Sequence, residues 1–322
     1  MSAEACVLMS ADGTALYEKN AGARCLIAST TKLMTALLCL ENADPDETVT
    51  AQERHCLVEG SSMYLRAGER YTVRELLLGL LLASGNDAAL ALAEHVAGSE
   101  TAFVALMNQR AAALGLRDTH FENPHGLDAA GHYSTARDLA RLMLRCMETP
   151  GFAALASART AEAGGNVLCN HNKLLALCPG CLAGKTGYTR AAGRCLVSCC
   201  EREGLRLVCV TLSDPDDWND HLSLYNWGYA AFRLFPAEGE LSFSVPVVSG
   251  SRESVRAAPQ PETRLLLPRL AETELRAELP RFVFAPVDAG ERAGTLRLFC
   301  GGEAFAELPL VYLQSAVPAW PC

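Results

Sequence analysis

Ser29 and Lys32 stand three residues apart at the head of an apolar run, residues 33–40. On a helix this spacing places the hydroxyl and the amine on one face, a single turn apart. An amine in an apolar pocket loses its proton more readily, and its neutral form can take the proton of the serine. The alternative is a helix capped by Ser29 with a solvated lysine. For an isolated S-x-x-K pair that alternative is favoured, because the pattern is short and its residues are common.

Two later stretches change this balance. S-G-N at residues 84–86 follows an apolar segment, and K-T-G at 185–187 follows Gly184. The S-G-N stretch alone fits a helix C-cap followed by an N-cap about equally well. However, S-x-x-K, then S-x-N, then K-T-G, in this order, is the motif set of penicillin-binding proteins and class A β-lactamases. Each motif is weak alone, and the three in order are specific.

With these motifs and their flanks, the chain resembles the D-alanyl-D-alanine carboxypeptidase family of low-molecular-weight penicillin-binding proteins. The resemblance covers about residues 5–235, and the last third resembles the small β domain of the family only in position and pattern. The matching stretches are 28–33 (ASTTKL), 61–68 (SSMYLRAG), 81–89 (LLASGNDAA), 123–128 (NPHGLD), 131–139 (GHYSTARDL), 170–175 (NHNKLL) and 184–189 (GKTGYT).

The resemblance implies three catalytic residues and a reaction through an acyl-enzyme. Ser29 attacks the carbonyl of the penultimate D-alanine and becomes an ester. Lys32 is the general base for that step, and Ser84 relays a proton toward the leaving amine. These roles suit the residue types, since a nucleophile beside an amine and a second hydroxyl is a workable arrangement for acyl transfer.

The resemblance also implies five substrate-binding residues. Asn86 orients the general base and hydrogen-bonds the substrate amide. Lys185 and Thr186 hold the terminal carboxylate. Gly187 lets the substrate lie flat along the strand edge, where a side chain would block it. The N–H group of Tyr188 joins that of the nucleophile in an oxyanion hole.

The implied function is a serine-type D-Ala-D-Ala carboxypeptidase that removes the terminal D-alanine from the peptidoglycan pentapeptide. Its partners would be stem peptides that end in D-Ala-D-Ala, with β-lactam antibiotics as covalent inhibitors. No cofactor is expected. The family acts outside the cytoplasmic membrane, so we expect this protein in the cell envelope, at the outer face of that membrane.

Two other functions compete with this one. A class A β-lactamase adds a glutamate in an E-x-x-x-N arrangement to activate the deacylating water. Glu162 and Asn166 fit that spacing, but they lie close before the K-T-G motif and far after the S-G-N motif, unlike the proportions of that family. The second competitor is a non-catalytic module that binds β-lactams or cell-wall peptides as a sensor. Three intact motifs argue against lost catalysis.

Composition and charge narrow the class of protein. Half of the 322 residues are hydrophobic, which indicates an ordinary globular protein. A net charge of −9 argues against a nucleic-acid surface. No uncharged apolar run approaches the ~18 residues that span a membrane. The first residues lack the basic start of a signal peptide, and no amphipathic anchor helix follows the last domain. We therefore expect a trimmed, mature-like chain, whose membrane association would need an anchor absent from this sequence.

Fourteen cysteines are many for a protein of either compartment. Six of them fall in apolar strand or helix patterns, where a free thiol acts as a small hydrophobe: Cys6, Cys39, Cys146, Cys195, Cys199 and Cys209. Cys178 and Cys181 form the one close C-x-x-C pair, and the Pro-Gly between them predicts a plain turn, with a disulfide, a redox role or a zinc site as the alternatives. Zinc would need a second ligand pair, and none has matching spacing. His125, His132 and His171 show no metal-ligand spacing either, so we expect loop hydrogen bonds and no metal site.

The elements around the motifs predict an α+β fold of the β-lactamase and transpeptidase type. A hairpin of residues 5–10 and 14–18 precedes the helices, and strands 182–188, 194–200 and 205–212 follow them. Together they predict a five-stranded antiparallel sheet with helices against it. The expected helices are 30–41, 73–83, 87–96, 100–114, 135–148 with Ser134 as its cap, and 217–235.

The pattern changes after residue 236, in a stretch with Pro and Gly. Short strands separated by turn residues predict a small all-β sandwich there. The chain is therefore expected to contain a serine DD-peptidase (penicillin-binding) domain over residues 1–236 and a small β domain over 237–322. The expected strands of the second domain are 241–248, 254–257, 263–267, 274–279, 281–284, 294–299 and 304–311.

Overall fold

The computed structural model describes residues 1–235, 241–260, 264–270 and 272–319. Contacts divide the chain into two compact units, Met1–Gly228 and Tyr229–Cys322. The predicted boundary between residues 236 and 237 lies outside the described residues. The observed division precedes it, because β10 (Phe232–Phe235) pairs with β13 (Leu265–Pro268) of the second unit.

The centre of the first unit is a five-stranded sheet with the strand order β2-β1-β9-β8-β7, and every neighbouring pair is antiparallel. This confirms the predicted sheet. Its strands are β1 (Ala5–Ser10), β2 (Ala15–Lys19), β7 (Cys181–Thr189), β8 (Gly193–Arg202) and β9 (Leu205–Leu212). The strand that carries the K-T-G motif, β7, therefore lies at one edge of the sheet.

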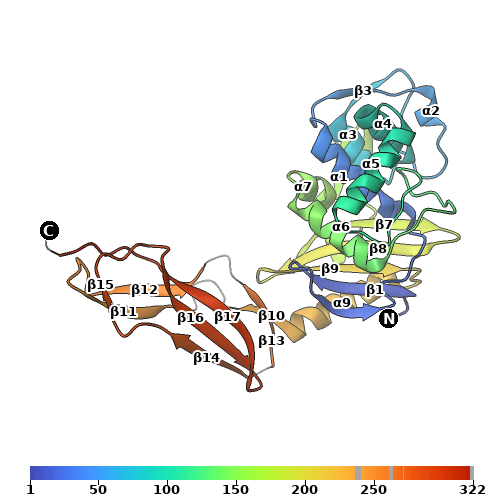
Figure 1. Cartoon of the computed structure of the whole chain (residues 1–322). Coiled ribbons are helices and arrows are strands. Elements are labelled where there is room, and N and C mark those ends of the chain that lie inside the picture. The colour runs from blue at the N-terminus through green and yellow to red at the C-terminus, as the bar shows by residue number, and fades with distance from the viewer. Residues whose placement is uncertain (236–240, 261–263, 271, 320–322) are drawn as a thin grey trace. The chain divides into compact units, whose positions relative to one another are not determined.

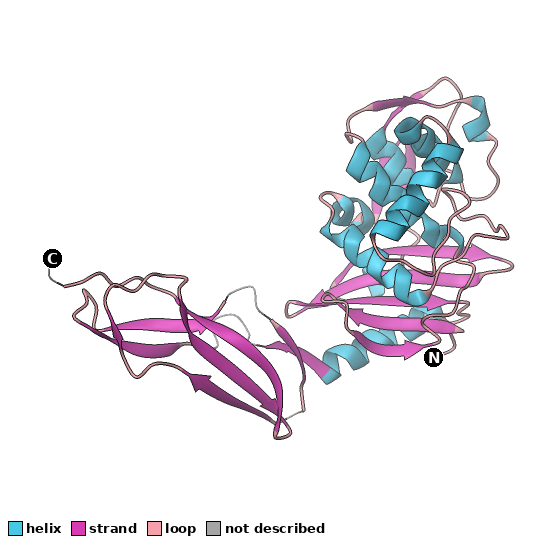
Figure 2. Ribbon diagram, in the orientation of Figure 1, coloured by secondary structure: helices cyan, strands magenta, loops and turns pink. Residues whose placement is uncertain are grey.

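Both faces of this sheet are buried, since successive side chains of a strand point to opposite faces. On β1, Val7 and Met9 join the core beneath α6 (Ala136–Glu148), whereas Leu8 faces α9 (Asp217–Ala231), where it lies against Gly228. Figures 1 and 2 show the sheet between α6 on one side and α9 on the other. Helices on two sides explain why these strands are nearly continuously apolar in sequence.

The helices confirm most of the predicted segments and correct three details. The structure has α1 (Lys32–Asn42), α3 (Val73–Leu81), α4 (Asn86–Ala97), α5 (Glu100–Ala113), α6 and α9. A 3₁₀ turn, η1 (Ala28–Thr31), precedes α1. Thr135 caps α6 in place of Ser134, which instead pairs with Cys25 in a β-bridge. The final helix ends at Ala231, because the next four residues form a strand.

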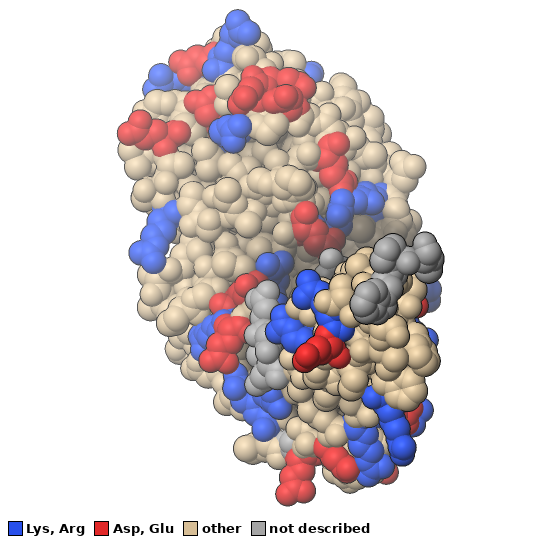
Figure 3. Space-filling view, turned by 90° about the vertical axis from the view of Figure 1, so that its left-hand side faces the viewer, with Lys and Arg blue, Asp and Glu red and all other residues tan. Residues whose placement is uncertain are grey.

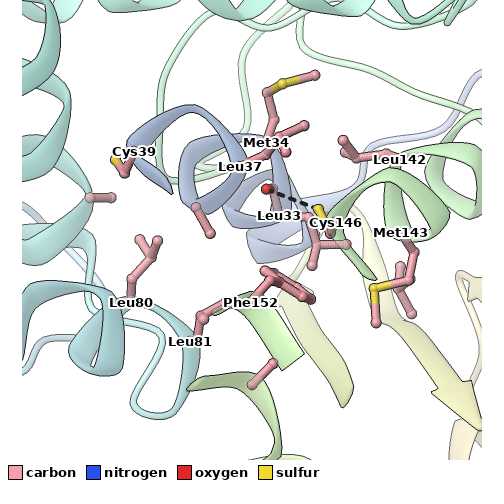
Figure 4. Close-up of a cluster of buried hydrophobic side chains, with 14 of the residues drawn as sticks. Leu33, Met34, Leu37, Cys39, Leu80, Leu81, Leu142, Met143, Cys146 and Phe152 are labelled. Carbon is pink, nitrogen blue, oxygen red and sulfur yellow. Dashed lines mark hydrogen bonds between the residues drawn. The ribbon is translucent and has the colours of Figure 1, made fainter. Parts of the chain in front are cut away.

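The helix that follows the S-x-x-K motif is buried on almost every side. Figure 4 shows Leu33, Met34 and Leu37 of α1 among side chains of α3, α6 and α7 (Phe152–Ser157). Leu33 is fully buried, and its carbonyl oxygen lies 3.5 Å from the thiol of Cys146. Because interiors are close-packed, such a helix is a rigid support for the residues at its start.

Smaller elements were missed by the sequence patterns. They are α2 (Glu53–Cys56), α7, α8 (Leu174–Leu177), and two antiparallel pairs, β3 (Thr48–Thr50) with β4 (Arg70–Thr72) and β5 (Thr160–Ala163) with β6 (Asn166–Cys169). Each spans only three to six residues, too few for a clear periodicity.

The second unit is a β domain with its own core. A six-stranded sheet in the order β14-β16-β17-β12-β11-β15 accompanies the β10–β13 pair. The buried side chains include Val245, Val255, Leu296 and Leu310. The strands are β11 (Phe243–Val248), β12 (Ser254–Pro259), β14 (Thr273–Glu278), β15 (Val283–Phe284), β16 (Arg292–Cys300) and β17 (Glu303–Tyr312).

The surface carries charges of both signs. On the face seen in Figure 3, Lys and Arg side chains lie among Asp and Glu. In the second unit, Arg297 on β16 forms ion pairs with Glu278 and Glu307 on its two neighbouring strands, at 2.7 and 2.6 Å. Within the described parts of the chain, no helix has the length and apolar character that crossing a membrane requires.

Candidate active site

Ser29 lies in the 3₁₀ turn η1 and is half-buried, while Lys32 is the first residue of α1 and is fully buried. Their side chains meet, with 2.8 Å between Lys32 Nζ and Ser29 Oγ. The serine is not the helix cap that its position indicated, since no side chain caps α1 or η1. Its hydroxyl is directed to the lysine instead.

Lys32 Nζ has three oxygen partners within hydrogen-bonding distance. Besides Ser29 Oγ, they are Asn86 Oδ1 at 2.7 Å and the His125 carbonyl oxygen at 2.6 Å. Burial lowers the pKa of Lys32 well below its usual value, and the positive charge of Lys185 lowers it further. Asp87 acts in the opposite direction and does not cancel the shift. The site therefore favours the neutral amine.

The S-G-N turn connects α3 to α4 and carries two of the predicted residues. Ser84 has a left-handed backbone with φ of 59°, an unusual conformation for a residue other than glycine. Asn86 begins α4, and its side-chain amide spans two partners, accepting from Lys32 and donating to the Glu59 carbonyl at 2.5 Å. The turn thus orients a hydroxyl and an amide toward the S-x-x-K pair.

Lys185 lies behind the hydroxyl of Ser84. Its Nζ donates to Ser84 Oγ at 3.0 Å and to the Thr186 carbonyl at 2.9 Å, and its side chain is 1% exposed. Burial lowers the pKa of Lys185 to about 7. The sequence placed Lys185 against the substrate carboxylate, whereas here its amine reaches the pocket only through Ser84.

Two glycines fix the loop that holds the nucleophile. A Cβ atom on Gly187 of β7 would stand 3.0 Å from the backbone nitrogen of Ser29. On the other side Gly126, with φ of 91°, lies against the carbonyl of Ala28, which a Cβ atom there would overlap. Gly187 therefore admits the nucleophile's own turn, in addition to any substrate.

A pocket of about 300 Å³ opens in front of these groups. It is lined by both serines of the motifs and by Thr186, Gly187 and Tyr188 of β7, with Ser61 and His171 at its side. The side chain of Tyr188 is 66% exposed, so its backbone rather than its ring contributes to the interior. The pocket lies along the edge strand, where an extended peptide could pair.

Three further residues line this pocket and were missed by the sequence reasoning. Arg194 of β8 forms an ion pair with Asp217 at 2.8 Å, and its guanidinium lies 5.8 Å from the centre of the Trp218 ring. The Nε atom of Arg194 is buried and has no hydrogen-bond partner. An oriented guanidinium with an unused donor is a site for an anionic group. Arg194 on β8 is the cross-strand partner of Tyr188 on β7. The register of these two strands was the one feature from which the sequence could have indicated Arg194 as a pocket residue.

Asp87 was also missed, although it follows the S-G-N motif directly. Its carboxylate accepts from Ser62 Oγ at 2.6 Å and from the backbone N–H groups of Met63 and Leu65 at 3.0 and 3.1 Å. Asp87 therefore holds the 61–65 loop against the start of α4. The loop in turn supplies Ser61 to the pocket.

The three predicted loop histidines differ in their surroundings. His132 accepts from the backbone N–H of Glu122 at Nδ1, so its Nε2 carries the proton toward Thr31 Oγ1, 2.7 Å away. Burial lowers the pKa of His132 to about 4 and that of His125 to about 3. Both rings therefore stay neutral. The His132 ring supports the 3₁₀ turn, whereas the His125 ring accepts from the backbone N–H of Leu127 within its own loop. His171 lies at the side of the Ser29 pocket. Among the residues that the structure describes, no cluster of three His, Cys, Asp or Glu could hold a metal ion.

Glu162, the candidate for a β-lactamase base, lies on the β5–β6 hairpin and is exposed. It is not among the residues that line the Ser29 pocket. Asn166, its partner in the spacing, donates to the Met63 carbonyl at 3.4 Å and lies on the same hairpin. The E-x-x-x-N match therefore reflects a strand hairpin away from the nucleophile.

Comparison with known proteins gives consistent matches. A family model described as D-alanyl-D-alanine carboxypeptidase matches residues 1–216. D-alanyl-D-alanine carboxypeptidase DacF of Bacillus subtilis (strain 168) is 31% identical over 327 residues, covering 96% of this chain and 84% of the relative. D-alanyl-D-alanine carboxypeptidase DacD of Escherichia coli (strain K12) is 33% identical over 309 residues, covering 89% of this chain and 80% of the relative.

Solved structures extend the match to both units. Penicillin-binding protein 5 of Haemophilus influenzae superposes with a TM-score of 0.77 at 28% sequence identity, over 98% of each chain. D-alanyl-D-alanine carboxypeptidase DacD of Francisella tularensis gives a TM-score of 0.76 at 24% identity, a likeness of fold.

Proposed function

Because the chain belongs to the D-alanyl-D-alanine carboxypeptidase family, we propose that Ser29, Lys32 and Ser84 carry out the hydrolysis of a D-Ala-D-Ala terminus. Ser29 is the nucleophile and Lys32 its general base. Ser84 passes a proton to the leaving amine. The product is a stem peptide shortened by one D-alanine.

One observation carries this assignment, the set of partners around Lys32 Nζ. The Asn86 Oδ1 and His125 carbonyl oxygens can only accept, so the two N–H bonds of a neutral amine satisfy them. The amine lone pair is then left for Ser29, the partner that has a proton to give. A neutral Lys32 is thus oriented to take the Ser29 proton as the new C–O bond forms.

The second half of the reaction needs a proton at the departing nitrogen. Ser84 lies on the pocket wall and receives a hydrogen bond from Lys185. As the C–N bond breaks, the Ser84 hydroxyl gives its proton to the amine and is reprotonated by Lys185. The N–H groups of Ser29 and Tyr188 stabilise the oxyanion, which in acyl transfer is commonly a large contribution.

The terminal carboxylate of the substrate is held by Thr186 and Arg194 in this proposal. Both line the pocket, and the Arg194 side chain, 42% exposed, brings a positive charge to it. Lys185 adds positive charge from behind, through Ser84. Gly187 keeps the strand edge open and Asn86 contacts the substrate amide. The partners are therefore peptidoglycan stem peptides and, as covalent inhibitors, β-lactams, encountered on the extracytoplasmic side of the membrane.

Intact-mass spectrometry after incubation with benzylpenicillin tests the proposal. We expect one penicillin per chain, attached at Ser29, that persists well beyond the turnover time of a D-Ala-D-Ala peptide. Penicillin keeps its leaving nitrogen tethered, and Glu162 does not line the pocket in which a deacylating water would be activated. Ser29→Ala should give no adduct and no peptide turnover, with a far-UV spectrum unchanged.

Two results would overturn the proposal. Rapid penicillin turnover without an adduct would favour a β-lactamase, and Glu162→Gln would then be the decisive variant. An adduct without any hydrolysis of D-Ala-D-Ala peptides would favour the sensor.

A further inference from the structure

Three cysteine thiols meet where β7 begins. Cys178 and Cys181 flank the turn before the strand, and Cys200 lies on β8 beside them. The Sγ atoms of Cys178 and Cys200 are 3.5 Å apart. Cys181 and Cys200 are direct cross-strand partners, and the neighbouring Cys200 thiol lowers the pKa of the Cys181 thiol. One S–H of Cys200 can serve only one of its two neighbours at a time.

The three thiols differ in their exposure to solvent and in the direction of their pKa shifts. Cys181 is partly exposed, whereas Cys178 and Cys200 are buried. Arg202 places Nη2 3.5 Å from Cys178 Sγ. The hydrogen bond from Cys200, with the charge of Arg202, lowers the pKa of Cys178 to about 6, and the bond from Cys200 also lowers that of Cys181. The same bonds raise the pKa of Cys200, which keeps its proton.

This arrangement differs from the plain turn that C-P-G-C predicted, because the third cysteine comes from the next strand. It also differs from a structural zinc site, which needs four ligands. A cross-strand pair has its Cα atoms about 4.5 to 5.5 Å apart, within the range that a disulfide bridges. Cys181 and Cys200 are such a cross-strand pair, next to a β-bulge between Cys181 and Ala183, and Cys181 is partly exposed.

We propose that Cys181 and Cys200 are a reversible oxidation site that forms a cross-strand disulfide by exchange with a small-molecule disulfide, with Cys178 as the proton acceptor. In the first step the Cys181 thiolate attacks one sulfur of the external disulfide. A mixed disulfide forms on Cys181, the external S–S bond breaks, and one external thiolate leaves and takes a proton from water.

In the second step Cys200 Sγ attacks Cys181 Sγ and passes its proton to the Cys178 thiolate. The mixed disulfide breaks and the second external thiolate leaves. Two protein thiols are oxidised to one disulfide, and one external disulfide is reduced to two thiols. Cys178, now protonated, remains free.

The bond would tie the first residue of β7 to β8, four residues before Lys185. Closing this loop restricts the unfolded chain, so the oxidised protein should melt about 5 °C or more above the reduced protein.

Peptide mapping of the full chain tests the proposal. Reduced protein is freed of reductant, incubated with oxidised glutathione, alkylated and digested with trypsin. Cys178 and Cys181 fall in the peptide of residues 174–185, and Cys200 falls in that of residues 195–202. We expect these two peptides to be linked, with reduction by dithiothreitol restoring the separate masses and the lower melting temperature.

Matched variants assign the bond. Cys200→Ala and Cys181→Ala should each abolish the linked peptides. Cys199→Ala should keep them, since Cys199 points to the opposite face of the sheet. Cys178→Ala should form the same link at least tenfold more slowly. Exposed Cys56 and Cys169 should stop at the mixed disulfide with glutathione.

Three outcomes would overturn the proposal. They are an unlinked 174–185 peptide oxidised within itself, a mixed disulfide on Cys181 that never resolves, and a link that survives Cys200→Ala or Cys181→Ala. Fragmentation of the linked wild-type peptides identifies the two bonded cysteines directly, and a bond from Cys178 to Cys200 would also overturn the proposal. Poor folding of a variant therefore cannot hide the answer.

Discussion

Ser84 accepts a hydrogen bond from Lys185 over 3.0 Å, so Ser29 and Ser84, the two serines of the motifs, each have their own buried lysine. The two pairs influence each other, since the charge of Lys185 is the second largest cause of the lowered pKa of Lys32. One pair is therefore suited to take a proton and the other to return one. This division gives each lysine a separate pH signature.

The Lys185→Gln variant should move the ascending limb of the pH profile. Acylation requires neutral Lys32, so its rate rises with pH as that amine loses its proton. Without the positive charge of Lys185, the pKa of Lys32 rises and the limb moves to higher pH. The measurement is kcat/KM, or the penicillin acylation rate, as a function of pH. Lys173→Gln, at an exposed lysine, should leave the limb in place. A lower rate with an unmoved limb would contradict the coupling.

Ser84→Gly should separate stability from activity. The left-handed backbone at Ser84 costs roughly 1 kcal/mol, which glycine avoids. The variant loses the hydroxyl that relays the proton, so we expect hydrolysis to fall by about 10²-fold or more while the melting temperature holds or rises. Ser84→Ala, which keeps the strain and also lacks the hydroxyl, is the matched control. Activity retained in both variants would remove Ser84 from the mechanism.

Arg194→Gln should discriminate between substrates by their terminal group. If Arg194 binds the carboxylate, its loss costs about 1.5 to 3 kcal/mol of binding, or roughly 10- to 100-fold in kcat/KM. An analogue with an amidated terminus should lose far less. Arg190→Gln is the control, because Arg190 is exposed at the turn after β7 and does not line the pocket. Equal losses on both substrates would make Arg194 a support for Asp217 instead.

Acid should destabilise the first unit through His221, which is fully buried between Ser198 and Thr211. Burial lowers its pKa to about 3 from an ordinary 6.5. Between these values the unfolded chain binds a proton that the folded chain does not, so stability is full above pH 6.5 and falls as pH falls toward 3. The loss is about 1.4 kcal/mol per pH unit.

Urea unfolding at several pH values between 6.5 and 4 measures this slope. His221→Gln, which retains hydrogen-bonding groups, should reduce the slope by the contribution of one histidine. His120→Gln, at an exposed ring, should leave it nearly unchanged. A slope unaffected by His221→Gln would place the acid sensitivity elsewhere.

The sequence predicted the parts of the fold that have a clear period or a specific motif. Apolar strand-length runs with turn residues between them, together with long apolar helices, predicted the five-stranded sheet and most helix limits. Short elements such as β5 and β6 were not predicted, because four residues are too few to show a strand or helix periodicity. The predicted final helix was four residues too long, because Phe232–Phe235 is apolar enough to continue α9. This segment forms a strand because it pairs with β13.

In the site, sequence order was enough to propose the residues of the three motifs, whose roles await the experiments above. The sequence did not indicate Arg194 or Cys200, because each comes next to the residues of β7 only through the pairing of β7 with β8. The burial of side chains was also not visible in the sequence. Lys185 was expected at the substrate, and only packing reveals that its amine lies behind Ser84.

The turn that holds Ser29 is enclosed by Gly126 and Gly187. A Cβ atom on Gly126 would overlap the Ala28 carbonyl, and one on Gly187 would press on the backbone nitrogen of Ser29 at 3.0 Å. A side chain at either position would therefore shift the nucleophile, and with it both the proposed hydrolysis and the proposed reaction with a β-lactam. At these two positions a change that weakens a drug's reaction with Ser29 also weakens the reaction with the natural substrate.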